Sequence, residues 1–433
     1  MKLWDKGYTI NNLVEKFTVG NDRILDLKLA EFDIAGNKAH AKMLHKIGLL
    51  TADELAGIEQ VLEEILEEVK AGTFQIDENF EDVHSKIEYV LTQKLGETGK
   101  KIHTARSRND QVLVDLHLFF KSEIEQIKKH IDALFKTLTG LADKYQHVIM
   151  PGYTHTQVAM PSSFGLWFSA YAETFIDDVI LLNAVYEIAD QNPLGSAAGY
   201  GSSFPIDRDL TTEELKFKYL KINSIAAQMS RGKLEKSLAF AIASTAGTLS
   251  KLANDIILFM SQNFNFLTFP KELTTGSSIM PHKKNPDVFE LIRAKANKLQ
   301  ALPNEIILIT NNLTTGYHRD FQLLKETVFP AVESVKEILS VADFMLNHIQ
   351  INESIMQNEI YDMIYSVELV NELVQKGMSF REAYQKVGAQ IQEGTYQPLK
   401  ELKHTHKGSL GNLALDEIKE KYRKVNKAES EQR

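Results

Sequence analysis

Apolar residues recur every three or four positions through most of the chain, which is the period of an α-helix. The pattern is longest between Asp110 and Val148. Its apolar positions there are Leu113, Leu116, Phe120, Ile124, Ile127, Ile131, Leu134, Leu138 and Leu141. At ~1.5 Å per residue, such a helix would be more than about 50 Å long. Further long helices are predicted at residues 162–188, 225–264 and 287–346, the last of them kinked or broken at Pro303 and at residues 314–316.

One predicted helix has no polar face. Residues 238–247 are apolar or small on every side, and a helix of this kind is buried all round. One chain of this size would hardly enclose several such helices, so we expect other subunits to cover them. Alternating strand patterns are scarce. The sequence therefore predicts an all-α protein with a bundle of very long helices that assembles into an oligomer.

Shorter signals mark where elements begin and end. Thr51-Ala52-Asp53-Glu54 has the form of a capping box, and Gly72 is a plausible stop for the helix that follows it. The basic stretch at residues 100–108 and the region near Asn352 are expected domain joints. The tail from Lys419 is too polar to be expected to pack.

Composition narrows the possible functions. The 433 residues include no cysteine, which excludes disulfides, thiolate metal sites and a cysteine nucleophile. A net charge of −9 argues against a general nucleic-acid surface, while local basic clusters suggest small anionic ligands. Residues 1–6 lack the apolar core of a signal peptide and no apolar run is long enough to span a bilayer, so we expect a cytoplasmic protein.

Four polar stretches interrupt the helical pattern: residues 103–111, 150–157, 276–285 and 315–325. The third, Gly276-Ser277-Ser278-Ile279-Met280-Pro281-His282-Lys283-Lys284-Asn285, combines glycine, free hydroxyls and two lysines, so it suits closure over a small anion. Each stretch taken alone is also explained by a solvated turn or a helix cap. No His-Glu-x-x-His occurs, and His404-Thr405-His406 lacks further ligands at metal spacing, so no metal is predicted.

Taken together, these stretches resemble the fumarase/aspartase superfamily and, within it, the argininosuccinate lyase family. Residues 276–285 are similar to the signature loop of the superfamily, and residues 103–111 and 151–157 resemble its other two active-site regions, in the same order. Residues 79–84, 104–111, 283–287 and 317–325 are similar to the versions found in the lyase family. The resemblance covers nearly all of residues 1–350 and weakens afterwards.

The resemblance implies an all-α, three-domain fold in which the central long helices form a twenty-helix core in a homotetramer. The expected domains are an amino-terminal helical domain at residues 1–105, a central bundle at 106–352 and a small carboxy-terminal helical domain at 353–433. The implied reaction is the reversible elimination that cleaves argininosuccinate to arginine and fumarate in arginine biosynthesis, without a cofactor, at active sites built from three subunits.

The site residues follow from matched positions. Ser277 corresponds to the base that removes a proton beside a carboxylate, and Lys283 to a group that stabilises the carbanion. His155 corresponds to the general acid and Glu290 to the carboxylate that orients it. The matched substrate-binding residues are Asp26, His84, Arg108, Asn109, Thr154, Asn285, Tyr317, Gln322 and Lys325. Asp22 is the alternative to Asp26, and Arg106 and Arg231 match supporting positions.

The sequence departs from the family at two places. The family's serine in an amino-terminal Phe-x-x-Ser segment is replaced within residues 17–22, and the carboxy-terminal region is short. Two other functions stay open at this point: another fumarate-releasing lyase of the superfamily, and a non-catalytic structural relative of the crystallin kind. The spacing of Gln322 and Lys325 argues against the first. The retention of Ser277, His155, Lys283 and Glu290 argues against the second.

Overall fold

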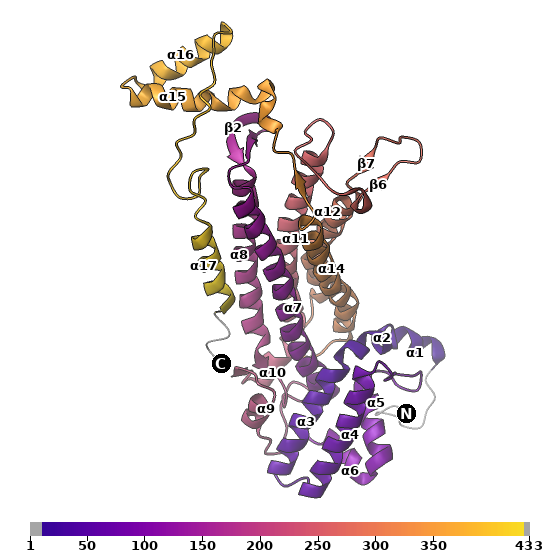
Figure 1. The fold of residues 1–433 in the computed structure, drawn as a ribbon. Coiled ribbons are helices and arrows are strands. Elements are labelled where there is room, and N and C mark those ends of the chain that lie inside the picture. The colour runs from indigo at the N-terminus through magenta and orange to yellow at the C-terminus, as the bar shows by residue number, and fades with distance from the viewer. Residues whose placement is uncertain (1–10, 428–433) are drawn as a thin grey trace. The chain divides into compact units, whose positions relative to one another are not determined.

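The computed structural model describes residues 11–427 and confirms the all-α prediction. The long helices, labelled in Figure 1, are α7 (Arg108–Lys144), α8 (Phe164–Ala189), α11 (Lys233–Met260) and α14 (Leu323–Leu346). Their apolar positions are spaced as the helical period requires, and the apolar series of α7 is buried from Leu113 to Leu138. None of the described helices has the combination of length and apolar character needed to cross a membrane.

The chain divides into two compact units, and each takes its residues from three separate segments. Unit 1 comprises residues 1–127, 181–243 and 299–335, and unit 2 comprises residues 128–180, 244–298 and 336–433. Each long helix therefore contributes one part to each unit. The domains predicted from boundaries at residues 105 and 352 are instead continuous in sequence. They stay a prediction.

Unit 1 begins with short helices packed around one apolar core. These elements are α1 (Asn12–Val19), α2 (Asp22–Leu25), η1 (Asp26–Leu29), α3 (Ala30–Lys46), α4 (Ala52–Lys70), α5 (Val83–Leu95), α6 (Glu97–Lys100) and η2 (Lys101–His103). The predicted capping box of Thr51 and Glu54 starts α4, and Gly72 follows its end with φ 70°, as expected. Asp82 and Ser85 form a second capping box, which starts α5. Later parts of unit 1 are α9 (Arg208–Glu214), α10 (Ser224–Gln228), α13 (Leu302–Thr310), η4 (Arg319–Gln322) and the parallel pair β3 (Gln191–Asn192) and β4 (Tyr219–Leu220).

Unit 2 contains short antiparallel strand pairs and the carboxy-terminal helices. The pairs are β1 (Ile149–Thr154) with β2 (Gln157–Ser163), β5 (Leu267–Thr268) with β8 (Gln350–Ile351), and β6 (Thr275–Gly276) with β7 (Lys284–Asn285). Its other elements are α12 (Asp287–Leu299), which ends at the unit boundary, α15 (Ser366–Gln375), α16 (Phe380–Gln392), α17 (Leu415–Lys427), η3 (Lys271–Leu273), η5 (Ile355–Gln357) and η6 (Glu359–Tyr365).

Three details differ from the helices predicted. The segment 225–264 is two helices, because Gly232 adopts φ 78° between α10 and α11. The tail from Lys419 was expected not to pack, and this was wrong for residues 419–427, which belong to α17. Tyr422 is buried there and stacks on Phe135 at 3.9 Å between ring centroids. The predicted break in residues 287–346 is confirmed, with Pro303 in the first turn of α13.

Candidate active site

A small polar cavity of about 130 Å³ lies within unit 1. Its walls come from four places in the chain: α2 and η1, the start of α5, the start of α7, and the segment around η4. The lining residues are Asp22, Asp26, Asp82, His84, Arg108, Asn109, Val112, Tyr317, Arg319, Gln322 and Lys325. We call this the polar cavity. It brings together seven of the predicted site residues, Asp26, His84, Arg108, Asn109, Tyr317, Gln322 and Lys325.

A buried lysine joins two sides of the polar cavity. The Nζ atom of Lys325 lies 2.6 Å from Oδ1 of Asp26 and 2.7 Å from Oδ1 of Asp22. Burial alone would lower the pKa of Lys325, but the two carboxylates raise it above its usual value. Both the predicted residue Asp26 and its alternative Asp22 therefore contact the same cation.

Gln322 and Arg319 hold the amino-terminal segment in which the family's serine is replaced. The side-chain amide of Gln322 donates to the carbonyl oxygens of Thr18 and Val19 at 3.0 and 2.9 Å. The guanidinium of Arg319 also donates to the Thr18 carbonyl. Main-chain groups of residues 18 and 19 thus occupy these donors, whichever side chain stands there.

Arg108 and Asn109 reach the polar cavity because α7 begins at this point. Ser107 caps the helix, since its hydroxyl accepts from the Asn109 amide at 3.2 Å and its own amide donates to Asp110 at 2.9 Å. The other carboxylate oxygen of Asp110 accepts from the amides of Gly195 and Ala197. Arg108 forms ion pairs with Glu81, at 2.9 Å, and with Asp82.

The two loosely matched arginines support the polar cavity through other residues. Arg106 is buried and donates to the side-chain oxygen of Asn37 at 2.7 Å. Arg231 is buried against Glu235, and its guanidinium also donates to the carbonyl of Phe321 at 2.6 Å. Neither arginine lines the polar cavity.

The six remaining predicted residues belong to two loops of unit 2. Thr154 and His155 lie at the end of the β1–β2 hairpin, in the register Thr154↔Gln157. His155 and Thr156 have φ values of 53° and 59°. A two-residue turn with positive φ at both central positions is normally made by Asn-Gly or Gly-Gly. A histidine and a threonine in this conformation are strained, and such strain is concentrated at functional sites.

Ser277, Lys283 and Asn285 belong to the loop closed by β6 and β7, and Glu290 to the first turns of α12. The Ser277 hydroxyl oxygen accepts from the amides of Ile279 and Met280 at 3.3 and 3.1 Å. Asn285 donates to the Gly276 carbonyl at 3.3 Å, which helps to close the loop. Within residues 11–427, the side chains of His155, Lys283 and Glu290 make no hydrogen bond or ion pair, and all three are exposed.

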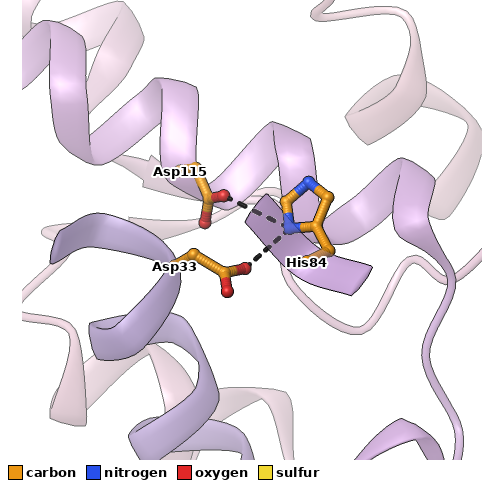
Figure 2. A group of neighbouring side chains, drawn as sticks. All are labelled: Asp33, His84 and Asp115. Carbon is orange, nitrogen blue, oxygen red and sulfur yellow. Dashed lines mark hydrogen bonds and ion pairs between the residues drawn. The ribbon is translucent and has the colours of Figure 1, made fainter. Parts of the chain in front are cut away.

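Several residues around the polar cavity were not predicted. Asp82 and Arg319 line it, although Asp82 stands in residues 79–84, which resemble the lyase family, and Arg319 in the polar stretch 315–325. Asp33 and Asp115 lie behind His84, as Figure 2 shows. The signal for Asp115 was available, because it follows Arg108 by seven residues and so shares its face of α7. It is a charged residue placed between the apolar positions Leu113 and Leu116.

The chain is similar to proteins of one known family over most of its length. A family model described as Lyase matches residues 8–301. Argininosuccinate lyase of Bacteroides fragilis is 53% identical over 417 residues, which are 96% of this chain and 93% of that protein. Argininosuccinate lyase of Thermotoga neapolitana is 45% identical over 386 residues, 89% of this chain and 97% of that protein.

Solved structures show the same fold at lower identity. EDDS lyase in complex with formate has a TM-score of 0.81 at 20% identity, over 97% of this chain and 92% of that one. A fumarate lyase:delta crystallin from Brucella melitensis has a TM-score of 0.73 at 18% identity, over 97% and 93%.

Proposed function

The chain belongs to the argininosuccinate lyase family of lyases, and we infer from this premise that it cleaves argininosuccinate reversibly to arginine and fumarate. The single observation that carries this assignment is the 53% sequence identity to such a relative over 96% of this chain. The polar cavity supports it independently, because it offers both cations and carboxylates to a substrate that carries both charges. The elimination transfers no electrons to or from the substrate, so it needs no redox cofactor.

The elimination requires a base, a site for negative charge and an acid. The base removes a proton from the carbon beside a carboxylate, and the electron pair spreads into that carboxylate. The carbon–nitrogen bond then breaks, and the acid protonates the departing nitrogen. We assign these roles to Ser277 as the base, His155 as the acid and Glu290 as the carboxylate that orients it, with Lys283 and Asn285 stabilising the carbanion.

A serine hydroxyl is a weak acid, so Ser277 needs help to act as a base. The two amides that donate to its oxygen, those of Ile279 and Met280, are the type of group that stabilises an oxyanion. Lys283 follows on the same loop and would add a positive charge. Thr154, next to His155 on the hairpin, is assigned to substrate binding together with the residues of the polar cavity.

We further propose that the protein acts as a homotetramer with active sites shared among subunits. The support is apolar surface that one chain leaves uncovered on its long helices. Phe240 of α11, within the segment predicted to be buried all round, is 54% exposed in the single chain. Ile180, Leu181, Leu258 and Leu291 are also exposed. A soluble monomer rarely exposes so many large apolar side chains on its main helices.

The three-domain division at residues 105 and 352 and a cytoplasmic location complete the proposal. The family supplies both, and the biosynthetic relatives support the second.

One assay tests the substrate and the base together. The purified protein is mixed with argininosuccinate, aspartate or adenylosuccinate, and released fumarate is followed by its ultraviolet absorbance. We expect a signal with argininosuccinate. Ser277→Ala should lower turnover by about 10³-fold or more while argininosuccinate still binds, because a base acts in the transition state.

The neighbouring serine supplies the matched control. Ser278 is exposed on the same loop and, among the described residues, has no hydrogen-bond partner, so Ser278→Ala should retain most of the turnover. A signal with aspartate or adenylosuccinate and none with argininosuccinate would refute the substrate. Equal losses in the two variants would refute the role of Ser277.

A further inference from the structure

Three buried ionisable side chains meet beside the polar cavity: Asp33 of α3, His84 of α5 and Asp115 of α7 (Figure 2). Nδ1 of His84 lies 2.7 Å from Oδ1 of Asp33 and 3.7 Å from Oδ2 of Asp115. The side chains are 4%, 2% and 0% exposed for His84, Asp33 and Asp115. Of the three, only His84 lines the polar cavity. The two aspartates therefore act on the cavity only through the histidine.

The contact between Asp33 and His84 fixes the ring. The second carboxylate oxygen of Asp33 accepts from the amide of Asn37 at 2.8 Å, and Arg106 donates to the oxygen of that amide at 2.7 Å. Asp33 is therefore held on both sides and accepts the Nδ1–H of His84. Figure 2 shows the other ring nitrogen, Nε2, on the side of the ring away from Asp33. His84 lines the polar cavity, and Nε2 is its ring nitrogen that is not bonded to Asp33.

Asp115 has no hydrogen-bond donor of its own. Both of its oxygens are buried without a hydrogen-bond partner among the described residues, and a buried carboxylate needs a nearby cation or a proton. The ring of His84 is the group in ion-pair range. Helices α3 and α7 lie close together beside Asp115 at Gly36 of α3, where an added Cβ atom would lie 3.2 Å from Val114 of α7 and 3.8 Å from Asp115. The small residue lets α3 approach α7 at this point.

The charges that face His84 favour its protonated form. Asp33, Asp115 and Asp26 approach from α3, α7 and η1, and the guanidinium of Arg106 acts on Asp33 and Asp115. Burial raises the pKa of Asp115 well above its usual value, and the charges of His84 and Arg106 oppose this rise. Burial alone lowers the pKa of His84, but the three carboxylates outweigh it and raise the pKa to about 9. At neutral pH the ring then carries a proton on both nitrogens, and Nε2 is a charged donor.

We propose that Asp33 and Asp115 are positioning residues that keep His84 doubly protonated, so that its Nε2–H binds a carboxylate of the substrate in the polar cavity. The proposal rests on the function inferred above. Without the aspartates the ring would be neutral at physiological pH, as burial disfavours its charge. If the ring is neutral and its Nδ1–H still donates to Asp33, Nε2 carries no proton and is an acceptor. An acceptor at this position repels a carboxylate.

A metal ion held by the same three groups is the competing explanation, since their ligand atoms lie within 4.8 Å of one another. Three observations favour the hydrogen-bonded arrangement. The Nδ1–Asp33 distance is that of a charge-assisted hydrogen bond. The other oxygen of Asp33 is already bonded to Asn37. The cluster also shares its surroundings with the Arg106 guanidinium, which would repel a cation.

The test is the pH dependence of kcat and KM for argininosuccinate in the full-length protein. For the unmodified protein we expect a constant KM up to about pH 9 and a rise of tenfold or more above it, as the charged donor is lost. Lys325 keeps its charge through this range because its pKa is raised. Asp115→Asn, which keeps the shape but removes the charge, should move the rise in KM about one pH unit or more lower. Its kcat at neutral pH should change less than threefold, because the effect is on binding.

Asp178→Asn is the matched control. Asp178 is also buried, accepts from the hydroxyls of Ser244 and Thr248, and does not line the polar cavity, so its substitution should leave the pH profile of KM unchanged. A profile for Asp115→Asn that matches this control would overturn the proposal. A flat KM from pH 7 to pH 10 in the unmodified protein would overturn it without any variant, even if Asp115→Asn fails to fold.

Metal binding is measured separately, by thermal unfolding with Zn²⁺, Co²⁺ or Mn²⁺ after chelator treatment. A rise in Tm that Asp115→Asn abolishes would identify a metal site and overturn the proposal. If the unmodified protein releases no fumarate from argininosuccinate, the inferred function fails. If the unmodified protein releases fumarate but Asp115→Asn does not shift the pH profile of KM, the inferred function stands and the positioning role of Asp115 is refuted.

Discussion

Replacing Lys325 with methionine removes the cation shared by Asp22 and Asp26 while keeping an unbranched side chain in its place. The side chain of Lys325 is 5% exposed, that of Asp26 is 2% exposed and that of Asp22 is 15% exposed. Removing one partner of a buried ion pair costs about 3–5 kcal/mol, because the remaining charge is left without compensation. Here two neighbouring carboxylates would remain without their cation, so we expect a loss of about 4 kcal/mol at pH 8.

The loss should depend on pH, and the sign follows from proton binding. Burial and Asp26 already raise the pKa of Asp22 above its usual value in the presence of Lys325. Without the lysine, the folded-state pKa of Asp22 rises further above its unfolded value, so the folded state binds more protons than the unfolded one. The stability of the variant then falls as pH rises. As the pH falls to 5, protonation of Asp22 relieves part of the uncompensated charge, and the loss should shrink to about half.

Urea unfolding followed by circular dichroism measures both effects, at one protein concentration because the protein is expected to be oligomeric. Lys28→Met is the matched control, since Lys28 pairs with Glu333 at 2.7 Å on the surface and its loss should cost less than about 1 kcal/mol. Adding Asp26→Asn to Lys325→Met should restore part of the stability. Equal losses at pH 5 and pH 8, or a loss no larger than that of Lys28→Met, would refute the reasoning.

Three further expectations follow from other contacts. The stabilisation that His84 gains from its carboxylates should be complete below pH 6.5 and lost as pH rises to about 9, an amount of about 3 kcal/mol. Unfolding of the unmodified protein and of His84→Gln at both pH values would measure it. A difference in stability between the two proteins that does not change with pH would contradict it. In thermal unfolding, Asp110→Ala should lower the stability by about 3 kcal/mol, because the amides of Ser107, Gly195 and Ala197 lose their acceptor. Asp53→Ala, on the exposed first turn of α4, should cost far less in the same experiment. Phe240→Lys should reduce the molecular mass measured by light scattering without loss of helix. Phe380→Lys, at a similarly exposed phenylalanine of α16, should leave the mass unchanged. An unchanged mass for Phe240→Lys would contradict assembly through α11.

The long helices could be predicted because their information is local. The apolar series of α7 repeats over nine positions, and a capping box or glycine marks many ends. The hairpin at residues 149–163 could not be predicted in this way. Its turn uses His155 and Thr156 in a conformation that neither residue prefers, so the usual Asn-Gly signal is absent. The helix α17 was missed because one residue, Tyr422, anchors an otherwise polar segment.

The candidate site divides along a similar line. Seven of the residues identified by resemblance meet in the polar cavity, although they come from separate parts of the sequence. The motifs named these residues but not the partners that set their charge. Asp33 and Asp115 belong to no motif, and only the close approach of α3 and α7 at Gly36 makes them neighbours. Contacts of this kind depend on packing, which a single sequence does not display.

The two groups of site residues also differ in how their charges are compensated. In the polar cavity, Arg108, Lys325 and His84 are each paired with carboxylates of the same chain. A substrate carboxylate must therefore compete with the carboxylates that are paired to Arg108 and Lys325, whereas Nε2 of His84 lies outside the pair with Asp33. This competition favours a ligand that brings its own cation to those carboxylates, as argininosuccinate does. On the loops of unit 2, the side chains of His155, Lys283 and Glu290 are exposed and unpaired within the described residues. The roles proposed for these three groups require them to be enclosed around the substrate during the reaction. Their exposure in one chain is consistent with the proposal that other subunits complete the site.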